Sequence, residues 1–402
     1  MATAHAANWP SWRGPENNGV SRETEFPTSW SKSNNIVWQT PLPGPGNSTP
    51  IVWGNRVFIT CALDKGARRG VICFDRKDGK VLWQQDLPYA TKEPSHETNP
   101  YCSSSPITDG ERVIAWQGSA GLVAYDMDGK LLWHRNDLGP FTHIWGNAST
   151  PLFDGDNVIA YFGPGLNVFV AAFDKKTGKD VWRIPLDDAK AKTVDQFYGS
   201  WSSPVIREAD GKKELILGLP KQIVAYDLAT QKQLWTCGGL GPLVYNNPLV
   251  SGDTVVVMSG YSGPAVGMRT GGSGDVTATH RLWQITDKKD LPQRVGSGII
   301  VGEHIYICND PGFAQCIESK TGKEIWREKL GVTSWSSMSY AGGKLYVIDF
   351  RGETFVLNAS PEFMLISRNP LGEMTRGSHA FSEGQIFIRT YNNLYCIGTP
   401  AK

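Results

Sequence analysis

The sequence predicts an all-β protein: a single eight-bladed β-propeller, closed by a strand from the N-terminus. Two observations lead to this prediction. A motif of an aromatic residue, an aspartate, a short turn ending in Gly-Lys and a tryptophan recurs along the chain. Its tryptophans stand roughly 40–55 residues apart, which is the period of a four-stranded blade. A second motif, two small polar residues often followed by proline, occurs once in each unit.

The first motif is predicted to form the hairpin between the third and fourth strands of a blade, C and D. Its aspartate should accept hydrogen bonds from turn amides, and its glycine should adopt a positive φ. Recurrence in register indicates that the tryptophans pack between adjacent blades rather than bind a ligand. The copies are Phe74-Asp75…Gly79-Lys80…Trp83, Tyr125-Asp126…Gly129-Lys130…Trp133, Phe173-Asp174…Gly178-Lys179…Trp182, Tyr226-Asp227…Gln231-Lys232…Trp235 and Ile317-Glu318…Gly322-Lys323…Trp326.

The second motif is predicted to begin strand A, the innermost strand, because small residues suit the crowded axis and proline is tolerated at a strand's first residue. Strand B follows after a tight turn and alternates with period two, as in Lys344-Leu345-Tyr346-Val347. The starts of strand A are Ser48-Thr49-Pro50, Ser104-Ser105-Pro106, Ser149-Thr150-Pro151, Ser202-Ser203-Pro204, Asn247-Pro248, Ser297-Gly298, Ser336-Ser337 and Ser378-His379.

The two ends of the repeat array complement each other. The last unit reaches strand C at residues 393–397 and has no strand D, while residues 35–40 resemble a strand D without a blade. Pairing these segments removes a free sheet edge. We therefore expect an irregular arm over residues 1–34, packed on a propeller over residues 35–402. A glycine-rich insertion, residues 263–279, is expected between strands B and C of the fifth blade, with no helix after it.

The charge balance bears on the partners of the chain, and its first residues bear on the compartment. The chain has 40 basic and 39 acidic residues, which gives no electrostatic case for nucleic acid. It has no run of eighteen apolar residues, so no membrane span is expected. The first residues do not form a signal peptide, but Ala4-His5-Ala6 resembles the end of a cleavage site. These residues leave both a secreted and a cytoplasmic protein open.

Seven cysteines leave at least one unpaired. Cys73, Cys316 and Cys396 occupy equivalent strand positions, which favours a buried small side chain. A cross-strand disulfide between Cys61 and Cys73, or between Cys308 and Cys316, is left open by the sequence.

The motifs quoted above, with Trp9-Pro10-Ser11-Trp12-Arg13-Gly14-Pro15, resemble the pyrroloquinoline-quinone-like (PQQ-like) propeller family, a WD40-like quinoprotein fold. The resemblance runs from about Trp9 to Ile397, and it implies a periplasmic or secreted protein. Quinoprotein alcohol dehydrogenases of this kind use the quinone with calcium and carry two adjacent cysteines. This chain has no Cys-Cys pair and no calcium ligands that match, so the resemblance assigns no cofactor and disfavours PQQ with calcium. A second relative is the scaffold lipoprotein of the outer-membrane β-barrel assembly machine, but no lipobox cysteine occurs here.

An up-and-down blade places its D–A and B–C connections on one face of the propeller and its A–B and C–D turns on the other. The variable connections therefore collect at one mouth, the axial funnel. Aromatic faces with Arg, His, Asn and Asp suit a polar organic ligand, and a His-Tyr-Arg set could move a proton next to a carboxylate. The catalytic candidates are His96, His143, Tyr198, Arg376 and His379. The ligand-binding candidates are Tyr101, Trp145, Asn147, Trp201, Tyr245, Asn246, Arg294, Asp310, Trp335, Asp349 and Arg351. No residue is assigned to a metal.

Three functions remain open at this stage. The first is a secreted or periplasmic binding or scaffold propeller with a polar aromatic funnel, which holds a small molecule, a saccharide or a protein partner. The alternative is a saccharide-active enzyme, a lyase, hydrolase or oxidoreductase, that uses His, Tyr and Arg in the funnel. The third is a PQQ-dependent dehydrogenase, which the missing cysteine pair counts against. The sequence does not decide whether the protein is an enzyme.

Overall fold

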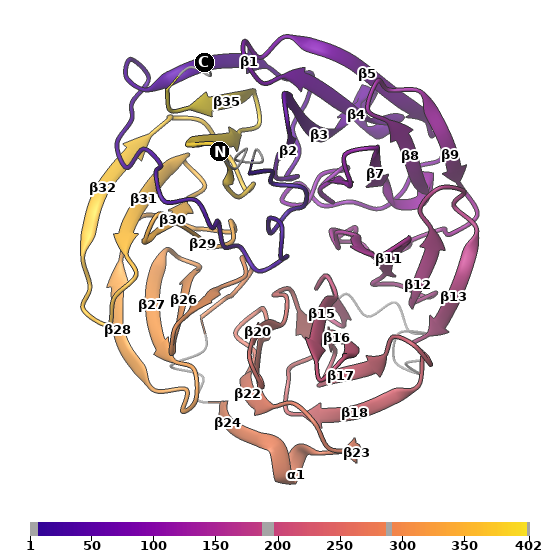
Figure 1. Ribbon diagram of the computed structural model, residues 1–402, viewed down its shortest axis with the longest axis vertical. Helices are drawn as coiled ribbons and strands as arrows, with labels where there is room; N and C mark the ends of the chain where they lie inside the picture. The colour runs from indigo at the N-terminus through magenta and orange to yellow at the C-terminus, as the bar shows by residue number, and fades with distance from the viewer. Residues whose placement is uncertain (1–6, 187–196, 287–291, 400–402) are drawn as a thin grey trace, which may run out of the picture. The chain divides into compact units, whose positions relative to one another are not determined.

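The computed structural model describes residues 7–186, 197–286 and 292–399. The chain forms two compact units, residues 1–140 with 338–402 and residues 141–337. Within the described residues each unit holds four blades, so the chain has the predicted all-β, eight-bladed propeller fold (Figure 1). In every blade the strands run as an antiparallel meander in the order A, B, C, D.

Unit 1 contains blades 1, 2, 7 and 8 and two short 3-10 helices, η1 (Asp64–Gly66) and η2 (Gly118–Ala120). The strands of blade 1 are β2 (Ile51–Trp53), β3 (Arg56–Leu63), β4 (Arg68–Asp75) and β5 (Val81–Pro88), and those of blade 2 are β6 (Ile107–Thr108), β7 (Arg112–Trp116), β8 (Leu122–Asp126) and β9 (Leu131–Arg135). Blade 7 is β29 (Ser339–Ala341), β30 (Lys344–Ile348), β31 (Glu353–Asn358) and β32 (Leu365–Pro370), and blade 8 is β33 (Ala380–Ser382), β34 (Gln385–Arg389), β35 (Asn393–Ile397) and β1 (Ile36–Pro41).

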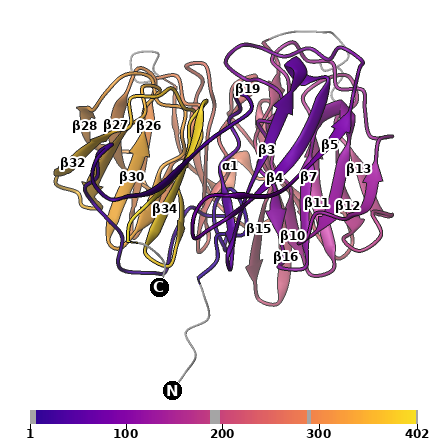
Figure 2. The same cartoon turned by 90° about the horizontal axis from the view of Figure 1, so that it is seen from above.

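Unit 2 contains blades 3 to 6; Figure 2 shows β26, β27 and β28 of blade 6 side by side. Blade 3 is β10 (Leu152–Asp154), β11 (Asn157–Phe162), β12 (Phe169–Asp174) and β13 (Asp180–Pro185), and blade 4 is β15 (Val205–Ala209), β16 (Lys212–Leu219), β17 (Gln222–Asp227) and β18 (Gln233–Gly238). Blade 5 is β20 (Leu249–Ser251), β21 (Thr254–Met258), β22 (Ala265–Arg269) and β24 (Arg281–Ile285), and blade 6 is β25 (Ile299–Val301), β26 (His304–Asn309), β27 (Phe313–Glu318) and β28 (Glu324–Lys329). The remaining elements are β14 (Gly199–Ser200), β19 (Leu243–Val244), β23 (Gly274–Asp275) and α1 (Thr277–His280).

The C–D hairpins have the chemistry that the motif predicts. The Asp174 carboxylate accepts the Thr177 N–H at 2.8 Å and its hydroxyl at 2.7 Å. Asp227 accepts the same two groups from Thr230. Gly178 has φ +70°, and Gln231, which replaces glycine in blade 4, has φ +58°. The hairpin therefore needs the left-handed conformation even where the side chain disfavours it.

The strand-D tryptophans pack against the next blade, as predicted. The Trp38 Nε1–H of blade 8 donates to the Arg76 carbonyl of blade 1 at 2.7 Å. Trp83 donates in the same way to Met127 at 2.9 Å, and Trp283 to Ser319 at 2.8 Å. Each indole thus buries its apolar surface and satisfies its N–H on a C–D turn of the neighbouring blade.

The N-terminal strand completes the last blade. β1 pairs antiparallel with β35, with Trp38 opposite Cys396 and Thr40 opposite Leu394 (Figure 1). The predicted pairing is confirmed, and it covers the edge that β35 would otherwise expose.

The small polar motif lies just before strand A rather than inside it, which corrects the predicted strand start. Its residues link blades to each other. In unit 1 the Ser378 N–H donates to Thr49 Oγ1, and the Thr49 N–H donates to Ser105 Oγ. In unit 2 the chain of bonds runs from Thr150 N–H to Ser203, Asn247, Ser297 and Ser337 at 2.8–3.0 Å. These backbone groups pair with a neighbouring blade's side chain, so they do not join their own blade's ladder.

The glycine-rich insertion differs from the prediction. Strand C of blade 5 is β22, so the extra residues lie in the C–D connection rather than between B and C. Within them β23 pairs in parallel with β18 of blade 4, and the short helix α1 follows, contrary to the expectation of no helix. The insertion covers an outer sheet edge, which its sequence pattern alone did not reveal.

All seven cysteines are buried and free. In the β3–β4 register Cys61 lies opposite Gly70 and Cys73 opposite Phe58. In the β26–β27 register Cys308 lies opposite Ala314. The register therefore separates both pairs of thiols that the sequence left open as disulfides.

The described part of the N-terminal arm packs on unit 1. Trp9 exchanges backbone hydrogen bonds with Val52 of blade 1, and Val20 bridges to Tyr340 of blade 7. Arg13 is buried and donates to the Met338 carbonyl. In the part of the chain that the structure describes, no helix is long and apolar enough to cross a membrane.

Candidate functional site

Six side chains from blades 3, 4 and 5 form one aromatic cluster in unit 2. They come from D–A connections and from the B–C connection of blade 5, the connections that the meander predicts to share a face. We define the aromatic cluster by these residues: His143, Trp145, Phe197, Trp201, Tyr245 and Tyr261. Four of them, His143, Trp145, Trp201 and Tyr245, are sequence-predicted site residues.

Trp145 is the centre of the cluster. Its ring stacks near Tyr261 at 6.1 Å and 25° and meets the edge of Phe197 at 5.6 Å and 85°. Phe197 is 42% exposed and Tyr261 53% exposed. Solvent therefore reaches an aromatic rim, and offset and edge-on contacts of this kind each stabilise by about 0.5–1.5 kcal/mol beyond area burial.

The base of the cluster is buried, and hydrogen bonds join its rings to the loop backbone. Trp201 is 8% exposed, and its Nε1–H donates to the Gly146 carbonyl at 2.9 Å. His143 lies edge-on to Trp201 at 4.8 Å. The Trp145 N–H donates to His143 Nδ1 at 3.2 Å, which places the proton of a neutral imidazole on Nε2. The polar atoms of the base hold loops together.

Backbone contacts fix the loops that carry the rings. β14, just before Trp201, pairs in parallel with β19, just before Tyr245. Gly260 allows the B–C connection to approach, since a Cβ there would lie 1.9 Å from the Tyr245 ring. Burial raises the pKa of the Tyr245 hydroxyl, and the Tyr261 hydroxyl nearby adds to the rise. Tyr245 therefore stays a neutral phenol at physiological pH.

Arg294 and Asn246 brace these loops. Arg294 is 1% exposed, and its Nη1 donates to the Gly263 carbonyl at 3.2 Å. Burial lowers its pKa to about 10, so it remains charged at neutral pH. Asn246 Nδ2 donates to the Gly296 carbonyl at 2.6 Å. Both of these ligand-binding candidates donate hydrogen bonds to loop carbonyls in this structure.

The other predicted residues of unit 2 lie in the same kinds of connection. Asp310 accepts the Thr333 hydroxyl at 2.8 Å and donates its N–H to the Gln293 carbonyl. Asn147, Tyr198 and Trp335 are half-buried loop residues outside the named strands. The ligand and catalytic roles of these residues remain predictions.

In unit 1, Arg376 belongs to a second, smaller group. Its guanidinium lies over the Phe350 ring at 4.3 Å and donates to the Tyr391 hydroxyl. Asp349 is buried, and its carboxylate accepts the N–H groups of Arg351 and Glu353 at 2.9 and 3.1 Å. The Asp349 contacts stabilise a B–C turn, while the Arg351 side chain is exposed.

The remaining candidates of unit 1 have different surroundings. His96 is exposed, with Nδ1 hydrogen-bonded to Thr98 Oγ1 at 2.8 Å. The Tyr101 ring lies under the Arg69 guanidinium at 4.1 Å. His379 has no exposed surface, bonds Thr354 Oγ1 at 3.0 Å, and its pKa is lowered by burial to about 3. Their catalytic or ligand roles remain predictions.

Sequence reasoning missed Phe197 and Tyr261, which are the most exposed rings of the aromatic cluster. A signal for each was present. Phe197 directly precedes the candidate Tyr198, and Tyr261 begins a Tyr-Ser-Gly turn after strand B of blade 5. Both are large apolar residues in loops, where they have no blade to pack against.

The residues present do not fit a quinone–calcium cofactor. Over residues 7–186, 197–286 and 292–399 no group of three or more His, Cys, Asp or Glu could hold a metal ion. The seven thiols are free, and none is adjacent to another in sequence.

Comparisons with known proteins identify the family and the fold. A family model of PQQ-like type, described as outer membrane protein assembly factor BamB, matches residues 30–281. The curated protein sequences contain no significant match. Among solved structures, BamB from Moraxella catarrhalis is 19% identical with a TM-score of 0.58, and the alignment covers 80% of this chain and 84% of that one.

Two enzymes with the same fold are also similar. A europium-containing methanol dehydrogenase is 11% identical with a TM-score of 0.68, and the alignment covers 98% of each chain. A quinohemoprotein alcohol dehydrogenase from Comamonas testosteroni is 12% identical with a TM-score of 0.70, covering 98% of this chain and 81% of that one. At these identities the likeness shows the fold alone.

Proposed function

The chain belongs to the PQQ-like propeller family described as outer membrane protein assembly factor BamB, and from this premise we propose that it is a binding propeller of the periplasm or the secreted fraction. The aromatic cluster of unit 2 docks a protein partner. The observation that carries the proposal is the rim: the Phe197 and Tyr261 rings are exposed next to a buried, hydrogen-bonded base.

The chemistry of the rim supports docking. Aromatic residues are enriched among the side chains that dominate protein interfaces, because they bury large area at low entropic cost. The rings are held by neighbouring rings and by paired loops, so little further ordering is needed on binding. The family description, an assembly factor, supports a protein as the partner.

A photo-crosslinking experiment tests this proposal. The residue p-benzoylphenylalanine replaces Phe197 or Tyr261 in the cells that make the protein, and it replaces Val181 as the control. Val181 is 50% exposed on a strand D of the same unit, so it matches the exposure without the cluster. We expect one discrete protein adduct at positions 197 and 261 and none at 181. The absence of any cluster-specific adduct would refute the proposal.

The affinity for the crosslinked partner then gives the magnitude. The double variant Phe197→Ala/Tyr261→Ala should weaken binding about 30-fold or more, since interface hot spots cost about 2 kcal/mol or more. The matched double variant Val181→Ala/Ile325→Ala removes exposed apolar area elsewhere in unit 2 and should change Kd by about twofold or less. Equal loss in both variants would show that the rim is not the interface.

A saccharide-active enzyme is the competing function, because His143 stands among flat aromatic faces that suit sugar rings. It predicts turnover on a glycan panel that is lost in His143→Ala, His96→Ala or Arg376→Ala. A PQQ-dependent dehydrogenase predicts dye-linked oxidation after reconstitution with quinone and calcium. Either activity in the wild-type protein would replace the binding proposal.

A further inference from the structure

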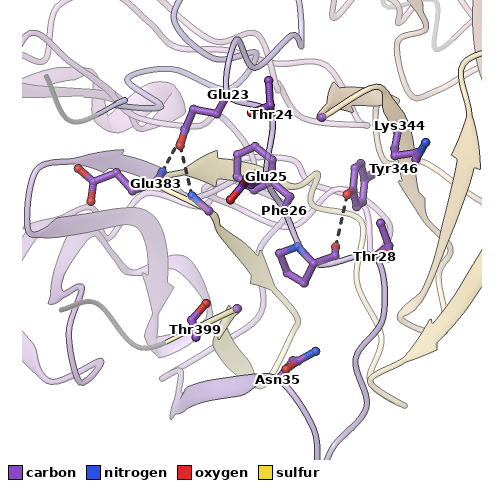
Figure 3. A pocket seen from close by; sticks show the side chains of 14 residues that line it. Glu23, Thr24, Glu25, Phe26, Thr28, Asn35, Lys344, Tyr346, Glu383 and Thr399 are labelled. Atoms are coloured by element: carbon purple, nitrogen blue, oxygen red, sulfur yellow. Dashed lines mark hydrogen bonds between the residues drawn. The ribbon is translucent and has the colours of Figure 1, made fainter. Parts of the chain in front are cut away.

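Unit 1 contains a cavity of about 940 Å³ on a different set of connections (Figure 3). The N-terminal arm, residues 23–28, forms one wall. The A–B turns of blades 7 and 8, at Gly342 and at Glu383-Gly384, form another, and Gly398 and Thr399 also line it. The volume falls in the range of about 300–1,000 Å³ that ligand sites occupy. Neither the repeat motifs nor the aromatic cluster accounts for this cavity.

Specific contacts fix the arm that walls the cavity. The Glu23 carboxylate accepts the N–H groups of Glu383 and Gly384 at 3.0 and 3.2 Å (Figure 3). The Tyr346 hydroxyl donates to the Pro27 carbonyl at 3.3 Å. Phe26 meets the edge of the buried Phe381 ring at 5.0 Å. The wall is therefore preformed, with two aromatic rings, Phe26 and Tyr346, among its lining residues.

More negative than positive side chains line the cavity. Three carboxylates, Glu23, Glu25 and Glu383, line it with one ammonium group, Lys344. Glu383 pairs with Arg76 at 2.7 Å, and Lys344 Nζ donates to Asn358 Oδ1 at 2.9 Å.

Glu25 differs from the other two carboxylates. Its side chain is exposed and makes no hydrogen bond or ion pair with the other described residues. The cavity thus presents one uncommitted carboxylate among aromatic rings and threonine hydroxyls.

We propose that this cavity binds an arginine-bearing segment of a partner protein. The guanidinium pairs with the Glu25 carboxylate and lies against the half-buried Phe26 ring. A carboxylate beside an aromatic face suits guanidinium, which forms bidentate bonds in its plane and stacks through its faces. The hydroxyls of Thr24, Thr28 and Thr399 line the same cavity and can bond the segment's backbone. This inference stands independently of the function proposed for the aromatic cluster.

The test uses the full chain and a fluorescein-labelled Gly-Arg-Gly-Arg-Gly peptide, with binding followed by anisotropy. We expect Glu25→Arg to weaken binding at least about tenfold, because it replaces attraction by repulsion at the contact. The matched control Glu362→Arg makes the same charge change at an exposed residue in the C–D turn of blade 7, outside the cavity lining. It should change Kd by about twofold or less. Because Glu25 is exposed, both variants should fold, which thermal unfolding checks.

Three outcomes would overturn the inference. Equal weakening by Glu25→Arg and Glu362→Arg would mean diffuse attraction to a negative surface. Binding of free arginine amide as tight as that of the peptide would mean a small-cation site rather than a docking site for a segment. No binding of the peptide by the wild-type protein up to about 1 mM would mean that the cavity holds no such ligand. Selective loss in Glu25→Arg, with weaker binding of the amide, supports it.

Discussion

The aromatic cluster of unit 2 and the cavity of unit 1 are both built from connections between propeller strands, yet they expose opposite chemistry. In the cluster, Trp201 and His143 form hydrogen bonds with the loop backbone, and the rings at the rim are exposed. The cavity engages Glu23 and Glu383 but leaves the Glu25 carboxylate uncommitted. The difference shows that a loop residue is available to a ligand when the backbone does not already use it.

The largest effect should come from the base of the cluster. Trp201→Ala removes a buried indole that contacts His143, Trp145 and Tyr245, and it should lower the free energy of unfolding by about 3–5 kcal/mol. Urea unfolding with hydrogen exchange should place the loss in unit 2. A loss below about 1 kcal/mol would mean that Trp201 contributes little packing energy and that the cluster has no packed base.

The second effect is a pH dependence of stability that His379 of unit 1 causes. The folded His379 pKa is about 3 because of burial, whereas the unfolded value is about 6.5. Above pH 6.5 both states are neutral there. Below it the unfolded chain binds a proton that the folded chain does not, so stability falls by up to about 1.4 kcal/mol per pH unit, or about 2–3 kcal/mol between pH 6.5 and 4.5.

Urea unfolding of the wild type and of His379→Gln at both pH values measures this term as a difference, which cancels the carboxylates common to both proteins. We expect the variant to lack the His379 contribution to the slope. Parallel slopes in the two proteins would contradict a neutral, buried His379.

The third effect is a difference in stability between two variants of the cavity's carboxylates, Glu23→Ala and Glu25→Ala. Glu23→Ala removes the acceptor of two backbone N–H groups and should cost about 1–3 kcal/mol. Glu25→Ala removes a side chain with no partner among the described residues and should change stability by about 0.5 kcal/mol or less. Thermal unfolding of the two variants side by side checks the ranking, and similar losses would mean that Glu25 also holds the arm.

The smallest effect is expected at the rim of the cluster. Phe197→Ala and Tyr261→Ala each remove a partly exposed ring together with its contact to Trp145, so the free energy of unfolding should fall by about 1 kcal/mol. Chemical denaturation with intrinsic fluorescence measures this. A loss of 2 kcal/mol or more in either variant would reassign the rim from recognition to structure.

Much of the fold could be predicted because the repeated residues act locally. Asp174 and Gly178 form their hairpin from contacts within a few residues. Trp38 and Trp83 recur in register, and equal spacing predicts equal packing. The pairing of residues 36–41 with the last strand followed from a missing strand at one end and an extra one at the other.

The candidate sites were predicted less completely because they depend on contacts between connections far apart in sequence. His143, Trp145, Trp201 and Tyr245 were identified, but Phe197 and Tyr261 joined them only through loop packing. His379 had the residue type of a catalytic group, yet only burial shows that its pKa is lowered to about 3.

The sequence by itself determined the eight-fold repeat, the four strands of each blade, the hairpin chemistry and the pairing of the N-terminal strand with the last blade. These features follow from periodicity and local turn preferences. Only the tertiary structure decided which loop side chains are already bonded and which remain open, as for Glu23 and Glu25 or for Trp201 and Tyr261. The physical reason is that burial and hydrogen-bond satisfaction are set by neighbours in space, and connections of variable length do not encode those neighbours in their own order.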